Sequence, residues 1–362
     1  MRLLVLGGTE FVGRAVAEAA VARGWEVTVF HRGRNRPPCG VRSLHGDRTA
    51  PDGLAALAAD PGGWDAVVDT WSAAPRAVLT ATRLLRGRAA RYVYVSSRSV
   101  YRWPWPSLGG DGSAGALVEG AFADAGQTEY AQDKRGGELA AVEAFGEEGS
   151  LLVRAGLILG PHENVGRLPW WLTRIARGGP VLAPGPRELP VQFIDARDLA
   201  GWLLGAVERG LSGPYDLIGP PGHSTMGELL DLCVRVTGAD AELRWTAPEA
   251  ILAAGIEPWT QLPVWTPPDS ELHDCAHRTD VSRALATGLV CRPPARTVAD
   301  TWRWLTQIGG AAPLRPDRTA PGLDPRVEAK VLAEAGGARP SAVDGAAGGV
   351  PGTTPQEAAS DD

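Results

Sequence analysis

Three polar residues in the middle of the chain have the types and the spacing of a proton-transfer site. Tyr130 and Lys134 stand four residues apart in YAQDK, so on a helix their side chains share one face. A free tyrosine, with a pKa of about 10, is a poor base, but an adjacent ammonium favours the phenolate and lowers that pKa. Ser97 ends an expected strand in VSSRSVY, where its hydroxyl could hold a substrate carbonyl or alcohol. Tyr130 and Lys134 alone would also suit a solvated helix pair, so the prediction depends on all three residues following a nucleotide loop.

A nucleotide-binding loop is predicted at the start of the chain. The first fourteen residues, MRLLVLGGTEFVGR, have the pattern of a strand, a tight glycine turn and a helix. Such a turn directs the unpaired N–H groups of the first helical turn, and the positive end of the helix dipole, toward one point, which suits a pyrophosphate. Glu10 replaces the middle glycine of the Gly-x-x-Gly-x-x-Gly form, but the donating amides are mainly those after it; a plain strand-turn-helix is the alternative. The predicted cofactor contacts in this loop are Gly7, Thr9, Glu10, Phe11, Val12 and Gly13.

The residues after the second expected strand favour NADP over NAD. An acidic side chain at this place would bind the adenosine ribose hydroxyls of NAD, whereas this chain has His31, followed by Arg32 and Arg34. Arginine offers planar, paired donors to a 2′-phosphate, so NADP is the expected cofactor and NAD the alternative, with a basic surface loop as the competing interpretation. Three further predicted cofactor contacts follow the third and fourth strands, and for the last of them packing under the sheet is equally expected: Asp47, Arg48 and Trp71.

The order of the elements predicts an α/β fold, a doubly wound parallel sheet of the Rossmann type with a smaller, mostly helical C-terminal substrate lobe. Strands of the sheet are expected at 2–6, 26–30, 41–45, 66–69, 91–95, 151–154 and 214–218, and a further short strand at 191–194. We expect residues 1–160, with 191–219 returning to them, to form the NAD(P)-binding domain, and residues 161–190 and 220–310 to form the lobe. Residues 311–362 are expected to form an extension with a short helix from Asp324, disordered from about 336.

The composition limits the classes of function. The chain has 362 residues, is 44% hydrophobic and carries a net charge of −6, which suits a globular protein and disfavours nucleic acid as its main partner. The four cysteines lie far apart without a C-x-x-C pair, so neither a zinc site nor a disulfide framework is expected. The first strand begins at Arg2 and no apolar run reaches membrane length, so we expect a cytoplasmic protein without a membrane partner or a bound metal.

Taken together, several motifs make the chain resemble the extended short-chain dehydrogenase/reductase superfamily, which contains NAD-dependent epimerases and dehydratases. The motifs are GGTEFVG at 7–13, VSSRSVY at 95–101, YAQDK at 130–134, RAGLILGP at 154–161, FIDARDLA at 193–200 and DVSRALATGL from 280. The resemblance implies that Tyr130 shuttles a proton, Ser97 orients the substrate oxygen and Lys134 binds the nicotinamide ribose while a hydride moves between nicotinamide and substrate. It also implies a homodimer through the helix that bears Tyr130.

Some residues depart from the pattern of the superfamily. Glu10 replaces a glycine, no Asn lies between Asp69 and Ser96, and Arg98 and Ser99 replace the Asp and Glu that sugar dehydratases use, which argues against sugar dehydration. The Gly-Gly-Thr-x-Phe loop is similar to that of an atypical branch that includes the chloroplast stem-loop-binding proteins. Those relatives bind RNA and lack the active-site tyrosine, whereas this chain has Tyr130.

We therefore expect an NADP(H)-dependent oxidoreductase or epimerase acting on a hydroxyl or keto group of a small molecule, such as a nucleotide sugar or a secondary metabolite. The alternative is a non-enzymatic NAD(P)-binding sensor or an RNA-associated protein, which Glu10 and the missing Asn favour and the acidic charge opposes. Five residues after the fifth expected strand are the predicted substrate contacts, and for each of them loop packing or a solvated polar role is the alternative. They are Trp103, His162, Asn164, Arg167 and Gln192.

Overall fold

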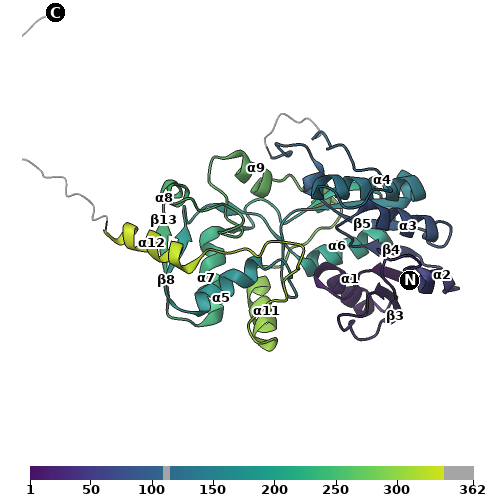
Figure 1. The fold of residues 1–362 in the computed structure, drawn as a ribbon, viewed down its shortest axis with the longest axis horizontal. Coiled ribbons are helices and arrows are strands. Elements are labelled where there is room, and N and C mark those ends of the chain that lie inside the picture. Colours follow the sequence, from purple (N-terminus) through teal and green to yellow (C-terminus); the bar gives the residue numbers. More distant parts are fainter. Residues whose placement is uncertain (109–114, 338–362) are drawn as a thin grey trace, which may run out of the picture.

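A seven-stranded parallel sheet forms the larger part of the fold (Figure 1). The computed structural model describes residues 1–108 and 115–337. The strand order is β11-β6-β5-β4-β1-β2-β3, and every neighbouring pair is parallel. Because the order reverses beside β1, the carboxyl ends of β1 and β4 flank the crevice where ligands of doubly wound sheets bind. The strands are β1 (Arg2–Leu6), β2 (Glu26–His31), β3 (Arg42–His45), β4 (Ala66–Asp69), β5 (Tyr92–Ser97), β6 (Ser150–Ala155) and β11 (Gly213–Leu217).

Alternating side chains of the buried strands form two hydrophobic layers, one on each face of the sheet. In β1, Leu3 and Val5 pack with α1 (Phe11–Ala22) and α6 (Ala196–Glu208). Leu4 and Leu6 pack on the opposite face with α3 (Pro75–Leu85) and α4 (Tyr130–Gly149). Both faces are therefore covered, as a parallel sheet requires, while the short helix α2 (Ala55–Ala59) lies beside β3.

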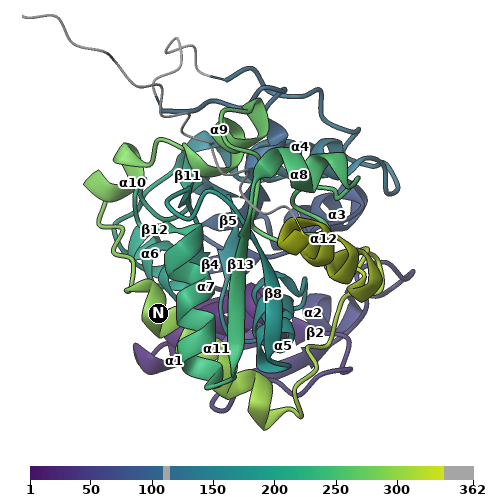
Figure 2. The same ribbon diagram turned by 90° about the vertical axis from the view of Figure 1, so that its left-hand side faces the viewer.

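The second half of the chain adds a smaller lobe beyond one end of the sheet (Figures 1 and 2). It contains a parallel pair of six-residue strands, β8 (Gly179–Pro184) and β13 (Ala241–Thr246), against which α12 (Pro325–Gly337) packs. Its other helices are α5 (Arg167–Ala176), α7 (Met226–Thr237), α8 (Pro248–Ala253), α9 (Glu271–His277), α10 (Ser282–Ala286) and α11 (Pro294–Gln307). Two short strand pairs complete it: β7 (Ile158–Leu159) with β10 (Ile194–Asp195), and β9 (Pro190–Val191) with β12 (Ser224–Thr225).

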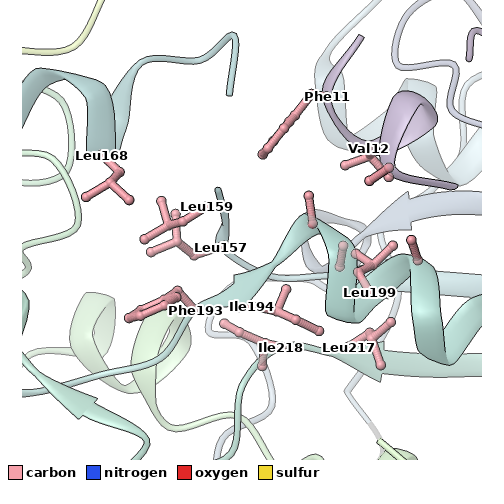
Figure 3. Close-up of a cluster of buried hydrophobic side chains, with 14 of the residues drawn as sticks. Phe11, Val12, Leu157, Leu159, Leu168, Phe193, Ile194, Leu199, Leu217 and Ile218 are labelled. Atoms are coloured by element: carbon pink, nitrogen blue, oxygen red, sulfur yellow. The ribbon is translucent and has the colours of Figure 1, made fainter. Parts of the chain in front are cut away.

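One apolar cluster joins the nucleotide loop to this lobe (Figure 3). Phe11 and Val12, at the start of α1, belong to the same buried cluster as Leu157, Leu159 and Leu168. Leu168 lies in α5, so the start of the first helix and a lobe helix share one core. The predicted cofactor contacts Phe11 and Val12 therefore turn their side chains to the core and leave their backbone amides for a ligand.

The predicted α/β fold agrees with the structure, and the lobe contains more strand than the sequence indicated. All seven predicted sheet strands form, with ends displaced by a residue or two. The single strand predicted at 191–194 is instead divided between β9 and β10, and the β8–β13 pair was not anticipated. Its partners are 62 residues apart between Gly179 and Ala241, and β8 carries two prolines, so no local pattern indicated the pairing.

The extension after α11 packs against the lobe. Glu328 of α12 is buried, accepts a 2.7 Å hydrogen bond from Arg174 Nε and a 3.1 Å bond from the Leu182 amide. Residues 336 and 337 end α12, and the remainder of the tail predicted to be disordered lies outside the described residues. Among the described residues, no helix has the length and apolarity to cross a bilayer. That part of the chain also has no cluster of three or more His, Cys, Asp or Glu suited to a metal ion.

Candidate active site

Lys134 lies buried at the carboxyl ends of β4 and β5. Its position one turn into α4 directs the ammonium to the edge of the sheet, where it donates 2.6 and 2.7 Å hydrogen bonds to the carbonyl oxygens of Trp71 and Val95. The Nζ atom also lies 4.9 Å from the centroid of the Tyr94 ring. An ammonium has three N–H donors, so one donor remains for a ligand or for the phenol of Tyr130.

Tyr130 is the first residue of α4, and two cations, Lys134 and Arg318, lower the pKa of its phenol. Burial by itself would raise the phenol pKa, but the charges of Lys134 and Arg318 outweigh burial and lower it. The side chains of Ser97 and Arg318 lie near the phenol and also favour its ionised form. Burial lowers the pKa of Lys134, with Tyr130 opposing that change. The site therefore eases ionisation of the phenol, which is what an acid–base residue needs near neutral pH.

Ser97 is fixed at the point where β5 ends. Its hydroxyl oxygen accepts a 3.1 Å hydrogen bond from the Ser99 amide and so caps the short 3₁₀ turn Arg98–Val100. The same hydroxyl group lies 3.1 Å from the Ser99 hydroxyl. The structure thus brings together Ser97, Tyr130 and Lys134, which the sequence analysis grouped from three separate segments.

The loop between β1 and α1 has the tight geometry that a dinucleotide cradle requires. Gly7 adopts φ +108°, and a Cβ atom there would lie 2.7 Å from the Thr70 hydroxyl; a Cβ on Gly13 would lie 2.6 Å from the Gly7 carbonyl oxygen. No side chain caps α1, so the N–H groups of its first turn, Phe11, Val12 and Gly13, are open to an anion. The Thr9 amide bonds the Gly7 carbonyl and closes the turn. These residues fit the diphosphate of a dinucleotide.

Glu10 turns its carboxylate sideways, away from a capping role. It accepts a 2.5 Å hydrogen bond from Asn35 and a 2.8 Å hydrogen bond from Asn164. These bonds join the nucleotide loop to the loop after β2 and to the segment before α5. Glu10 thereby links the two halves of the molecule, while its charge remains beside the proposed phosphate site.

The end of β2 carries the basic residues expected to select the cofactor. Arg32 and Arg34 are exposed, and after the hydrogen bonds from Thr49 their charges help to lower the pKa of Asp47. Asp47 accepts hydrogen bonds from the amide and hydroxyl of Thr49 at 3.0 and 2.7 Å, so it shapes its own loop. His31 is buried, with its ring centroid 4.6 Å from that of His45 and the two rings tilted by 58°. Burial lowers the pKa of His31, so its imidazole adds no charge to this basic loop at pH 7.

Arg48, predicted as a cofactor contact, is bonded inside the protein instead. Its guanidinium donates 2.6 and 2.8 Å hydrogen bonds to both oxygens of Asp69, a fully buried carboxylate that also accepts the hydroxyl of Tyr92. A third bond of 2.8 Å goes to the Ala77 carbonyl. The Arg48 side chain is thus committed to the interior under the sheet. Trp71 packs there too: the Arg48 guanidinium lies 5.2 Å from its ring, and its indole N–H bonds the Ala74 carbonyl.

The five predicted substrate contacts divide into two groups. His162, Asn164 and Arg167 lie before and at the start of α5, and of the three Asn164 contacts the nucleotide loop through its hydrogen bond to Glu10. Burial, followed by the charge of Arg14, lowers the pKa of His162 to about 4, so its imidazole is neutral at pH 7. By contrast, Gln192 is fully buried and exchanges three hydrogen bonds with Gly219 and Thr279.

Gln192 therefore fixes the lobe and has no free amide for a substrate, contrary to the expectation. Trp103 lies on the other side, 51% exposed, with its indole N–H bonded to Glu271 of α9 at 2.9 Å. Its indole is therefore engaged with α9 and with the Trp105 ring, which it meets edge-to-face at 6.0 Å.

Sequence analysis missed two arginines of the extension. The guanidinium carbon of Arg318 lies 4.6 Å from the centroid of the Tyr130 ring. The charge of Arg315 helps to lower the pKa of Lys134, and Tyr130 and Glu10 help to raise the pKa of Arg315. Both come from the sequence LRPDR at 314–318, which precedes α12. The only signal was two arginines three residues apart in a proline-rich connection, and that pattern is common on protein surfaces.

The parallel sheet and the glycine turn after β1 define a dinucleotide-binding protein of the Rossmann class. A sequence profile described as the NAD dependent epimerase/dehydratase family matches residues 3–217, more than half of the chain. The chain therefore belongs to the NAD-dependent epimerase/dehydratase family and is an NAD(P)-dependent enzyme of the short-chain dehydrogenase/reductase type. Membership confirms the resemblance stated from the motifs and decides against the non-enzymatic alternative. No curated protein sequence matches the chain.

Solved structures share this fold at low sequence identity. WbmH of Bordetella bronchiseptica, in complex with NAD⁺, is 17% identical with a TM-score of 0.61, over 85% of this chain and 99% of that one. UDP-glucose 4-epimerase of Thermotoga maritima, with UDP-glucose, is 15% identical with a TM-score of 0.60, over 85% and 99%. UDP-glucuronic acid 4-epimerase of Bacillus cereus, with NAD, is 15% identical with a TM-score of 0.57, over 85% and 99%.

Proposed function

We propose that the protein is an NADP(H)-dependent oxidoreductase or epimerase that acts on a hydroxyl or keto group of a small molecule, with Tyr130 as the acid and base. The observation that carries the proposal is the Tyr130 phenol, whose pKa is lowered by Lys134 and Arg318 against the effect of burial, beside the Ser97 hydroxyl. Tyr130 is the first residue of α4, and its phenol lies at the carboxyl edge of the sheet, where this fold binds its ligands.

In the proposed mechanism the protein moves one proton. The phenolate of Tyr130 takes the proton from a substrate hydroxyl as that carbon becomes a carbonyl, and returns it in the reverse direction. Ser97 holds the substrate oxygen with its hydroxyl. Lys134 stabilises the phenolate by its charge and has one N–H donor left for a ribose hydroxyl. When bound, the nicotinamide supplies the hydride acceptor or donor.

The first-turn amides of α1 and the basic loop after β2 are the proposed cofactor contacts. The diphosphate is assigned to the amides of Phe11, Val12 and Gly13, and the adenosine 2′-phosphate to Arg32 and Arg34. His31 offers no carboxylate to a free 2′-hydroxyl, which favours NADP. NAD is the alternative, since several fold neighbours are complexes with NAD.

The family and the ligands bound by the fold neighbours support the choice of substrate class. One neighbour binds UDP-glucose, and another, WbmG of Bordetella bronchiseptica, is in complex with NAD and UDP. A nucleotide sugar is therefore the first class to screen, followed by small hydroxy and keto metabolites. We assign the substrate to the space between the NAD(P)-binding domain and the lobe. The domain comprises residues 1–160 and 191–219, and the lobe comprises residues 161–190 and 220–310. We further infer a cytoplasmic enzyme, with a homodimer through α4 as its assembly.

Two measurements test this proposal together. Titration with NADPH and NADH, followed by energy transfer from tryptophan to the reduced nicotinamide, gives the cofactor affinity. Turnover is then measured with UDP-sugars and with a set of ketones and aldehydes for the wild type and Tyr130→Phe. We expect Tyr130→Phe to bind NADPH within about twofold of the wild type and to lose about 10²-fold or more in turnover, as general acid–base residues do.

The matched control is Tyr215→Phe, a tyrosine of β11 in the core beside Trp202. It should leave both affinity and turnover close to those of the wild type. Undiminished turnover in Tyr130→Phe would contradict the assignment of the base, and failure of the wild type to bind either nucleotide would contradict the whole proposal.

A further inference from the structure

A segment of the extension lies across the proposed active site. This strap, defined as residues 311–323, connects α11 to α12, outside the residues matched by the family profile. It is anchored by two backbone hydrogen bonds, from the Arg315 amide to the Asn164 carbonyl at 3.0 Å and from the Gly322 amide to the Thr260 carbonyl at 2.9 Å. A Cβ on Gly166 would lie 2.6 Å from Leu314 and 3.5 Å from Pro321, so the strap contacts the start of α5 closely.

The strap delivers positive charge to Tyr130. The Arg318 guanidinium lies over the Tyr130 ring, 4.6 Å from its centroid, and is only partly buried; its charge lowers the pKa of the phenol. Arg167, at the start of α5, is close enough for its charge and that of Arg318 to repel, since Arg318 contributes to lowering the pKa of Arg167 after burial. The strap contacts the segment that starts α5, so two guanidinium groups 151 residues apart in the sequence act on each other and on the proposed base.

Neither guanidinium has its charge matched by the part of the protein that is described. Arg315 is paired with both oxygens of Asp317, at 3.0 and 2.5 Å, but no ion pair to a carboxylate is found for Arg318 or Arg167 among residues 1–108 and 115–337. The carboxylate that acts on Arg167 is Glu163, and its two oxygens accept the amides of Arg167 and Leu168 at 2.6 and 3.2 Å. Arg167 instead rests on the ring of Trp259, 5.3 Å from its centroid.

We propose that Arg318 of the strap and Arg167 of α5 form a binding site for an oxyanion of the substrate, a carboxylate or a phosphate close to the reacting carbon. The site rests on the proposed function, because Tyr130 marks where that carbon lies. Guanidinium groups offer paired, planar donors that match both anions, and an anion between two unpaired cations relieves their repulsion. The partly buried setting strengthens the attraction relative to open water.

The proposed oxyanion site and the cofactor's phosphate site are built from different elements. The dinucleotide diphosphate is assigned to the first turn of α1, and Arg315, the strap arginine on which Glu10 acts, is already paired with Asp317. Arg318 and Arg167 are linked to Tyr130 and Trp259 instead. The extension that follows the family-matched residues would thus be part of the substrate site.

The test is calorimetric titration of the full chain, saturated with NADP⁺, with malonate and separately with glycerol 3-phosphate. We expect the wild type to bind at least one of the two probes, and Arg318→Gln and Arg167→Gln each to weaken that binding about tenfold or more, as loss of a charge-assisted hydrogen bond does. Preference for malonate identifies a carboxylate substrate, and preference for glycerol 3-phosphate a phosphorylated one. Arg235→Gln, which removes an exposed arginine of α7, is the control for net charge and should bind as the wild type does.

Two further variants guard against simple misfolding. Arg167→Lys and Arg318→Lys keep the charge and should retain part of the affinity, whereas the Gln variants lose it, with all thermal midpoints compared. No binding of either probe to the wild type, or equal binding by the Gln variants, would overturn the site. Faster turnover in Arg318→Gln would also overturn it, because the strap would then obstruct the site. Failure of the wild type to bind either NADPH or NADH would instead refute the proposed function, so the two failures are distinguishable.

Discussion

The carboxylate of Glu10 accepts a 2.8 Å hydrogen bond from the amide of Asn164, 154 residues further along the chain. Glu10 stands where the nucleotide loop of many Rossmann proteins has a glycine, and Asn164 precedes the first lobe helix. The residue that departs from the glycine pattern of this loop therefore adds a polar link between the loop and the lobe to the apolar cluster that already joins them. Its charge lies beside a site assigned to an anion.

Removal of the Glu10 charge should strengthen cofactor binding. Glu10→Gln keeps the side-chain length and one acceptor, and it removes a negative charge near the α1 N-terminus, where such charges count for about 0.3–1 kcal/mol. We expect NADPH to bind about two- to fivefold more tightly at low salt, with the gain shrinking at high salt. Glu18→Gln, in the same helix and paired with Arg14, is the control. Weaker NADPH binding by Glu10→Gln would mean that the link to Asn164 outweighs the charge.

The basic loop after β2 should decide between the two nicotinamide cofactors. Hydrogen bonds to charged groups are worth about 1.5–3 kcal/mol, so Arg32→Ala with Arg34→Ala should weaken NADPH binding about 10- to 100-fold or more. Binding of NADH should change by less than about threefold, because NADH has no 2′-phosphate to lose. Arg36→Ala, two residues further along, is the control. Equal losses for NADPH and NADH would contradict the assignment.

The charge of Lys134 should set the pH at which the enzyme becomes active. Burial raises the pKa of Tyr130 and the charge of Lys134 lowers it, so the pKa should be higher in Lys134→Met. The rise of the oxidation rate with pH should then move to higher pH in this variant. Turnover at pH 7.5 should fall about 10²-fold or more and recover in part above pH 9. The chain has only one other lysine, the exposed Lys330 of α12, and Lys330→Met is an exact chemical control. An unshifted pH profile in Lys134→Met would exclude this role.

The buried Arg48–Asp69 pair should dominate the stability of the sheet edge. Asp69→Asn leaves the buried guanidinium without its counter-ion, which typically costs about 3–5 kcal/mol. Asp231→Asn breaks the exposed ion pair with Arg187 and should cost at most about 1 kcal/mol. Urea unfolding of both variants measures the difference. A similar small loss in both would show that the buried network is replaceable.

Glu163 should give folding a pH dependence of its own. Burial raises its pKa to about 7, so the folded state holds a proton that the unfolded chain releases, and stability is highest below about pH 4.5 and declines as pH rises to about 7. The shift corresponds to about 3 kcal/mol at most. Glu163→Gln cannot ionise, so relative to the wild type it should be more stable at pH 8 than at pH 5. Thermal unfolding of both proteins at the two pH values checks this; a constant difference would contradict it.

The strands of the sheet were accessible from the sequence because their signals are local. Residues 66–69 were predicted as a strand and form β4 with the same bounds, since a short apolar run between turn signals suits a buried parallel strand. Tyr130 and Lys134 both lie in the first turns of α4, and their spacing of four residues places them on one face of the helix, as predicted. The β8–β13 pair was missed because its partners are distant and its pattern is broken by proline.

The sequence by itself determined which residues could do chemistry: the glycine turn, the Tyr130–Lys134 spacing and the basic end of β2 are all contiguous patterns. Tertiary structure decided which of them are free to do it. Arg48 is held by Asp69, Gln192 is enclosed by lobe backbone, and Arg318 is brought to Tyr130 from 188 residues away. The reason is that burial and the pairing of charges depend on contacts between distant segments, and these contacts form only when the chain has packed.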